Sequence, residues 1–188
     1  MSGSLEFFSV SWKELSEAIG SRQKELSRKV LRKTGSLFNE ISDPEKVAEG
    51  LDSWIADEVK GIVRVRKLGD GLGFLALVHY FGRPVGTLTH SAAGGRGFRG
   101  FLKTQAQAAL GPAIPLSHLL DRPILGIAST LDFSWGGLEA AELARLGPKL
   151  AEDAPDPPDE DHSAWMLDLW NALGSARDLG KDLITVYT

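Results

Sequence analysis

Residues 183–187, LITVY, and residues 5–10, LEFFSV, are short apolar and aromatic runs at opposite ends of the sequence. Runs of this length and composition are typical of β-strands. Each strand needs a neighbour in a sheet, because its backbone N–H and C=O groups must be hydrogen-bonded once they are buried. One sheet that contains both runs meets this need most simply. These two stretches therefore predict a sheet built from both the first and the last strand.

A third contribution to the sheet is expected from the middle of the chain. Residues 74–81, FLALVHYF, and 84–90, PVGTLTH, read as two strands joined by a tight turn, which is an antiparallel hairpin. Helical patterns fill most of the remaining sequence, at residues 12–19, 24–33, 44–60, 98–110, 115–120, 138–146 and 162–179. The prediction is a single α+β domain over residues 1–188. Its mixed, mostly antiparallel sheet contains both terminal strands and the central hairpin, with helices packed on it.

Composition excludes several classes of protein. The chain has 188 residues, of which 43% are hydrophobic and 24% charged, and this balance is ordinary for one globular domain. It has no cysteine, which excludes disulfides, thiolate metal sites and cysteine nucleophiles and suits a reducing compartment. Its apolar runs are far shorter than the roughly 20 residues that cross a bilayer, and the first residues do not resemble a signal peptide. We therefore expect a cytoplasmic protein without membrane association.

Charge is distributed unevenly along the sequence. Residues 71–120 contain four cations and no acid, whereas residues 121–188 contain thirteen acids and five bases. Residues 151–161, AEDAPDPPDED, contain six acids and three prolines and predict an exposed loop. Two interpretations stay open. Either the basic middle faces an anionic partner, or the acidic C-terminal third of the chain folds over it.

The sharpest motif lies in this basic middle. Residues 95–100, GRGFRG, match the pattern G-x-G-x-x-G of dinucleotide-binding turns, and Asp121 follows about twenty residues later. That turn requires a parallel βαβ unit, however, and here an antiparallel hairpin is expected to precede it. A glycine loop with arginines before a helix still suits a phosphate, a nucleic-acid backbone or an acidic protein surface. The candidate anion- or partner-binding residues are Gly95, Arg96, Gly97, Arg99 and Lys103.

Other candidate residues carry weaker signals. Trp135 precedes two glycines, which predicts a turn that presents the indole to a partner, although the indole would equally suit the core. His79 and His90 would face each other across the hairpin, as a metal or acid–base pair. No third ligand has informative spacing, so neither a metal nor a cofactor is expected. No catalytic motif surrounds any serine, so no catalytic residue is assigned.

Both ends of the chain resemble an uncharacterised bacterial family. Residues 7–26, FFSVSWKELSEAIGSRQKEL, are similar to the start of that family, in which a short aromatic strand leads into a hydrophobic helix, then Gly-Ser, a charged residue and a leucine. Residues 182–187, DLITVY, resemble its closing strand. The family has no assigned activity, so the resemblance implies no functional residues. Small bacterial proteins of this kind often serve as immunity or accessory proteins.

These observations predict a non-enzymatic, protein-binding factor of the immunity or accessory type, whose partner is another protein. The sequence pI near 5.6 is low for a dedicated nucleic-acid binder, so nucleic acid is not the expected partner. The alternative is an enzyme or binding protein that acts on a phosphorylated or nucleotide-like small molecule through residues 94–103. In that alternative His79 or His90 would act as the acid–base group.

Overall fold

The fold is described from a computed structural model of the chain. The structure describes residues 3–38, 44–56, 59, 61–65, 67–91, 94–112, 114–129, 133–156 and 162–188. The chain divides into two compact units. A sheet unit contains Met1–Ser9, Pro84–Arg122 and Ser134–Thr188, and a helical unit contains Val10–Arg83 and Pro123–Phe133. The expectation of one domain over residues 1–188 stays a prediction.

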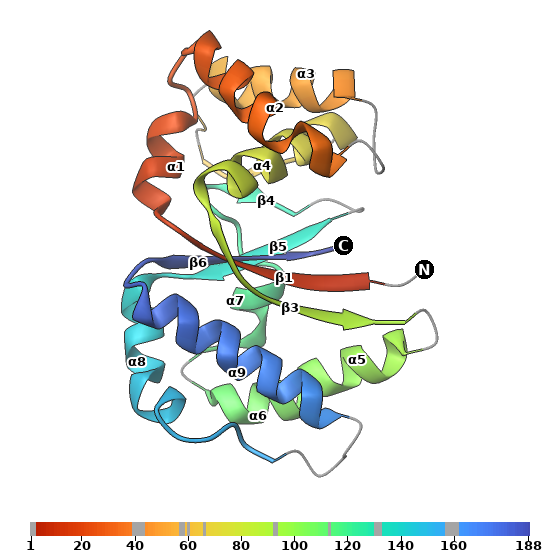
Figure 1. The fold of residues 1–188 in the computed structure, drawn as a ribbon, viewed down its shortest axis with the longest axis vertical. Coiled ribbons are helices and arrows are strands. Elements are labelled where there is room, and N and C mark those ends of the chain that lie inside the picture. Colours follow the sequence, from red (N-terminus) through yellow and green to blue (C-terminus); the bar gives the residue numbers. More distant parts are fainter. Residues whose placement is uncertain are drawn as a thin grey trace. The chain divides into compact units, whose positions relative to one another are not determined.

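The sheet unit is built on a four-stranded antiparallel sheet (Figure 1). Its strand order is β3-β1-β6-β5, with β3 at Arg83–His90, β1 at Gly3–Val10, β6 at Asp182–Tyr187 and β5 at Ser134–Leu138. The first and last strands are neighbours at its centre, and Ser4 and Thr188 exchange two backbone hydrogen bonds of 3.1 and 3.0 Å. The predicted α+β class, with both terminal strands in one antiparallel sheet, is confirmed.

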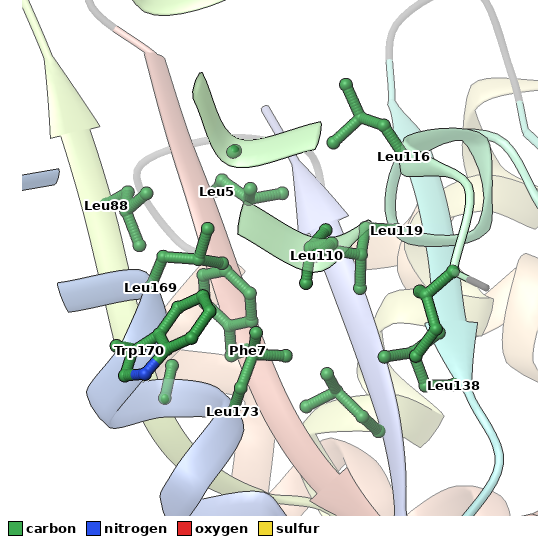
Figure 2. Close-up of a cluster of buried hydrophobic side chains, with 14 of the residues drawn as sticks. Leu5, Phe7, Leu88, Leu110, Leu116, Leu119, Leu138, Leu169, Trp170 and Leu173 are labelled. Carbon is green, nitrogen blue, oxygen red and sulfur yellow. The ribbon is translucent and has the colours of Figure 1, made fainter. Parts of the chain in front are cut away.

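Helices of the sheet unit cover one face of this sheet (Figure 1). They are α5 (Gly95–Phe101), the π-helical turn η1 (Leu102–Ala106), α6 (Gln107–Leu110), α7 (Leu116–Leu120), α8 (Ala140–Leu150) and α9 (Ser163–Asp178). Figure 2 shows the core between them and the sheet, where Leu5 and Phe7 of β1 meet Leu169 and Leu173 of α9. Each such side chain contributes up to about 1.5–3 kcal/mol when it leaves water. The predicted helices at 115–120 and 162–179 correspond to α7 and α9.

The predicted turn at Trp135 is wrong, because Trp135, Gly136 and Gly137 lie inside β5. The strand runs directly under α7, and a Cβ atom at Gly136 would lie 2.4 Å from the carbonyl oxygen of His118. Paired glycines usually indicate a turn, but a glycine within a strand also allows another backbone to approach closely. Alternation along the strand then places Trp135 on the opposite face of the sheet, where its side chain is fully buried.

The helical unit consists of α1 (Trp12–Ala18), α2 (Lys24–Phe38), α3 (Pro44–Ala56) and α4 (Leu68–Phe81). A parallel pair of two-residue strands, β2 (Val63–Arg64) and β4 (Ile127–Ala128), completes it. The Ser11 side chain caps α1 by accepting a hydrogen bond of 3.2 Å from the Glu14 backbone N–H. The sequence Asp43-Pro44-Glu45 is typical of a helix start, with Asp43 as the cap, and Asp43 lies outside the described residues. No helix in the described ranges is long and apolar enough to span a lipid bilayer.

The predicted central hairpin is wrong in its first arm. Residues 74–81 form the second half of α4, whereas 83–90 form β3, so no hairpin joins the two segments. All residues from Gly71 to Val78 are buried, because α1, α2 and α3 pack around α4. A helix buried on all sides is apolar all round and therefore shows no helical periodicity. Such an apolar run cannot be distinguished from a buried strand by its pattern.

Three glycines bring α3 and α4 into backbone contact. A Cβ atom at Gly50 of α3 would lie 1.8 Å from the carbonyl oxygen of Gly69 on α4. A Cβ atom at Gly73 would lie 2.3 Å from the carbonyl carbon of Gly50. The Trp54 indole donates a hydrogen bond of 2.6 Å to the carbonyl oxygen of Asp70 beside this contact. The two helices therefore require glycine at these positions.

We expect Gly50→Ala to destabilise the protein by roughly 3 kcal/mol or more, because its methyl group would force the two backbones apart. Gly35→Ala on α2 is the matched control, since no atom lies within 4 Å of a Cβ atom built there. It should stabilise the helix by about 0.5–1 kcal/mol. Urea denaturation followed by circular dichroism measures both changes. Equal stability of Gly50→Ala and the parent protein would contradict the α3–α4 contact.

Candidate functional site

The glycine-rich stretch at residues 94–100 is helical rather than an open loop. Helix α5 starts at Gly95 and continues through η1 and α6 to Leu110. The first hydrogen bond of α5 runs from the Phe98 backbone N–H to the Gly94 carbonyl oxygen, at 2.9 Å. The dinucleotide pattern requires its first glycines in a tight turn between a strand and a helix, whereas here all six residues of the pattern are helical. Residues 95–100 match the dinucleotide pattern in sequence but do not form such a turn.

Helix formation places the predicted cations on one surface. Arg96, Arg99 and Lys103 are exposed, and their spacing of three and four residues places them on one side of the helix. Gly100 is exposed on the same side, and we call these four residues the basic face. None of the three cations forms a hydrogen bond or an ion pair with a residue that the structure describes.

Buried aromatic rings hold the opposite side of α5. Phe98 and Phe101 are fully buried, and the Phe98 ring meets the Trp165 ring edge to face with 5.0 Å between their centroids. The Trp165 indole donates a hydrogen bond of 2.9 Å to the carbonyl oxygen of Thr89 in β3. At the next turn, His162 lies over Phe101 and pairs with the side-chain oxygen of Gln105 at 3.1 Å. The basic face is therefore carried on a helix fixed by the start of α9 and the end of β3.

His90 links α5 to the sheet. Its Nδ1 lies 3.0 Å from the Ser91 carbonyl oxygen, and its Nε2 lies 2.9 Å from the Tyr187 hydroxyl oxygen. Because a carbonyl only accepts, Nδ1 carries a proton, and in the neutral imidazole Nε2 then accepts the hydrogen bond of the Tyr187 hydroxyl. Gly3 of β1 makes room for this pair, since a Cβ atom there would lie 2.7 Å from Nε2. Both imidazole nitrogens are thus used in fixing structure.

The expectation that His79 and His90 face each other rested on the hairpin, and residues 74–81 and 83–90 do not form a hairpin. His79 belongs to α4 in the helical unit, whereas His90 ends β3 in the sheet unit. Burial lowers the pKa of His79, and its ring packs edge to face on Phe38. Among the residues that the structure describes, no group of three or more His, Asp or Glu side chains is placed to hold a metal ion.

The remaining predicted residues differ in what they present to a partner. Gly97 is exposed beside the basic face, and Gly95 is half-buried against the His90 ring. Trp135 is fully buried and offers no surface for binding. The structure therefore assembles Arg96, Arg99 and Lys103 and separates Trp135 from them.

A cavity of about 640 Å³ lies beside η1. Its floor contains Met166 and Trp170, and the indole Nε1 of Trp170 is buried without a hydrogen-bond partner. Exposed carboxylates line its edge, together with the side chains of η1 and α8; these residues include Thr104, Gln105, Lys149, Glu152, Asp153 and Asp156. The sequence does not reveal this cavity, because the helical spacing of Met166 and Trp170 indicates only a core-facing side of α9.

The acidic loop is partly described. Its residues 151–156 are mostly exposed, as predicted, and residues 157–161 lie outside the described residues. Lys149 donates hydrogen bonds to the carbonyl oxygens of Ala109 and Leu110 rather than to these acids. None of the described carboxylates forms an ion pair with the basic face. The described part of the acidic third therefore does not neutralise Arg96, Arg99 or Lys103.

An ionic network in the sheet unit joins the end of α7 to the start of α8. Arg122 donates hydrogen bonds to Glu139 and Glu142, and His118 Nδ1 lies 3.2 Å from the Glu142 carboxylate. Burial acts to raise the pKa of Glu142. Hydrogen bonds from the Glu139 backbone N–H and from Arg122, with the charges of Arg122 and His118, outweigh burial and leave the pKa of Glu142 below its ordinary value. In the sequence His118 lies close to Asp121 and Arg122, which is typical of local bonding, whereas its partner Glu142 is 24 residues away.

Substitution of one glycine of α5 by alanine, which adds a single methyl group, tests whether this segment is helical. Gly100→Ala should stabilise the protein by about 0.5–1 kcal/mol, because alanine favours a helix and its Cβ atom would meet nothing within 4 Å. Gly111→Ala is the matched control at the end of α6, where φ of +79° disfavours alanine and stability should fall. Thermal unfolding reports both changes. A loss of stability in Gly100→Ala would contradict the helix.

The Glu142 network should make the protein sensitive to acid. The pKa of Glu142 is depressed in the folded state, so its contribution is complete above the ordinary value of 4.5 and is lost as the pH falls through the folded pKa. Glu142→Gln should cost about 1–2 kcal/mol at pH 7 and progressively less towards pH 3. Urea unfolding at several pH values measures this difference. A constant difference between pH 7 and pH 3 would exclude this role for the Glu142 charge.

Comparisons with known proteins add no functional assignment. Searches against protein-family models, curated protein sequences and solved structures find no match to this chain. The resemblance of residues 7–26 and 182–187 to a bacterial family therefore stays a prediction.

Proposed function

We propose that this protein is a non-enzymatic binding factor that docks an acidic partner protein on the basic face of α5 and η1. One observation carries this proposal: Arg96, Arg99 and Lys103 are exposed on one side of a helix and have no ionic partner among the described residues. Factors of the immunity or accessory type act by covering a partner, which requires a surface rather than a set of catalytic groups.

The opposite side of α5 supports this role. Phe98 and Phe101 are buried under Trp165, so the helix is already fixed before a partner arrives. A preordered surface loses little conformational entropy on binding, and this favours affinity. Only the long side chains of Arg96, Arg99 and Lys103 remain to be ordered, at about 0.5–1.5 kcal/mol each.

Local charge also favours an acidic partner. No Asp or Glu occurs in residues 71–120. Helix α5 and its sequence neighbours therefore place no carboxylate beside the arginines that would compete with those of an acidic partner. A patch of one sign steers an oppositely charged protein towards the surface and accelerates association at low salt. Arginine also pairs with carboxylates through two parallel hydrogen bonds, which adds geometric selectivity.

The shape of the site favours a macromolecule over a small molecule. The cavity beside η1 is lined by Thr104 and Gln105 and by carboxylates, and the three cations of the basic face do not line it. A small anion is bound most tightly in a concave site that surrounds it. A row of cations on a convex helix instead matches an extended acidic surface.

The test is a charge reversal on the basic face. Arg96→Glu with Arg99→Glu should abolish capture of the partner when the tagged protein is incubated with nuclease-treated lysate of its source cells. Arg145→Glu with Lys181→Glu is the matched control, because both residues are exposed in the same unit and the change in charge is identical. Mass spectrometry should identify a protein bound by the parent and by the control but not by the reversed face, and released as salt rises.

Two outcomes would contradict the proposal. Identical sets of captured proteins from all three forms would exclude the basic face as the docking surface. Salt-dependent binding of a labelled oligonucleotide, lost in the reversed form while no protein is captured, would show that the partner is a nucleic acid.

A further inference from the structure

A second cavity, of about 560 Å³, lies within the helical unit between α2 and α3. Lys24, Ser27, Arg28 and Leu31 line it from α2, at a spacing that forms one side of that helix. The C-terminal end of α3 lines the other side with Asp52, Ile55 and Ala56, and Arg22 lies two residues before the start of α2. A volume of this size is typical of small-molecule sites.

Arg22 is held beside this cavity in an unusual backbone conformation. Its φ of +58° lies in the left-handed region, which non-glycine residues rarely adopt and which costs about 1 kcal/mol or more. The conformation directs the Arg22 backbone N–H to the Ile55 carbonyl oxygen, at 2.8 Å, and the Gly20 N–H to the Trp54 carbonyl oxygen, also at 2.8 Å. The turn thereby caps the end of α3 and fixes the arginine between the two helices.

The cations around the cavity are mostly unpaired. Arg22 and Lys24 form no hydrogen bond or ion pair through their side chains with residues that the structure describes. Arg28 pairs with Glu25 at 2.7 Å, and this pair is exposed, so it holds the arginine only weakly. Among the described lining residues there is one carboxylate, Asp52, which accepts a hydrogen bond of 2.6 Å from the buried Ser27 hydroxyl.

The geometry points to a binding site for a small phosphate monoester in this cavity. The described lining contains three cations and one carboxylate, which sum to two positive charges, and a phosphate monoester carries about 1.5–2 negative charges at pH 7. Arginine binds phosphate oxygens through two parallel hydrogen bonds, and the N-terminus of α2 adds its positive dipole. Leu31 and the buried Ile55 supply an apolar surface for the organic group of the ester.

This site is separate from the proposed protein-binding face, which belongs to the sheet unit. It also differs from the loop at 94–103 that the sequence suggested for a phosphorylated ligand. The basic side of α2 is visible in the sequence, but nothing there indicates that Arg22 adopts a positive φ or that Lys24 and Arg28 line a cavity together with residues of α3. The site depends on the pairing of the two helices.

Isothermal titration calorimetry with phenyl phosphate tests the site directly. Arg22→Asn with Lys24→Gln should weaken binding by about tenfold or more, and asparagine tolerates the left-handed conformation that Arg22 adopts. Lys29→Gln with Arg32→Gln is the matched control, because it removes the same charge from exposed positions of the same helix that do not line the cavity. The control should bind within about twofold of the parent protein.

Two further variants separate a specific site from general attraction to a basic helix. Asp52→Asn should tighten binding about threefold, because among the residues that the structure describes Asp52 is the one carboxylate of the lining, and asparagine retains an acceptor for Ser27. Ala56→Phe should weaken binding by filling the cavity without changing any charge. Circular dichroism checks that each variant is folded.

The ligands themselves distinguish the possible chemistries. Phenyl phosphate should bind more tightly than inorganic phosphate, and benzoate more weakly than both. Tighter binding of benzoate would overturn the phosphate assignment, and equal binding of both phosphates would overturn the role of Leu31 and Ile55. Equal losses in the control pair and in the Arg22 and Lys24 pair, or no binding of phenyl phosphate at millimolar concentration, would overturn the site.

Discussion

The antiparallel pairing of β1 with β6 is the interaction on which the sheet unit depends. Both strands are buried at the centre of the sheet, and β3 and β5 attach to their outer edges. The same pairing builds the support of the candidate site, because Gly3 of β1 lies between the strands that carry His90 and Tyr187. The hydrogen bond between those side chains anchors the rings under Phe98 and therefore the helix that displays the basic face.

The strands of this sheet are clear from the sequence at the two ends of the chain and unclear in the middle of the chain. The runs at 5–10 and 183–187 are strands, as their composition predicts. The run at 74–81 has equally strong strand character and is a helix, because its neighbours are other helices and its residues 74–78 are all buried. Local pattern reports how apolar a segment is, but tertiary packing decides between the two structures when both faces are buried.

Glycine positions are the second place where the predicted and the observed structure differ, and the physical reason differs from one glycine to another. Gly136 lies in a strand because α7 passes directly over it, and Gly50, Gly69 and Gly73 lie in helices because two backbones touch. Gly97 and Gly100 lie in a helix where a methyl group would meet little or nothing. A high glycine content therefore suggests flexible loops at positions where the chain forms regular helices or strands. The cations of α5 were found from sequence alone, but their shared face and the burial of Trp135 follow only from the fold.

The order of the strands also determines when the sheet unit can form during synthesis. The helices α1 to α4 lie within one continuous stretch of the helical unit, so their contacts are available as soon as residue 83 has left the ribosome. Strand β1 is made first, yet one of its two neighbours, β6, is made some 170 residues later. Contacts between such distant segments slow folding, and an apolar strand that waits for its partner is exposed to aggregation. The nascent chain must therefore keep LEFFSV protected until LITVY emerges.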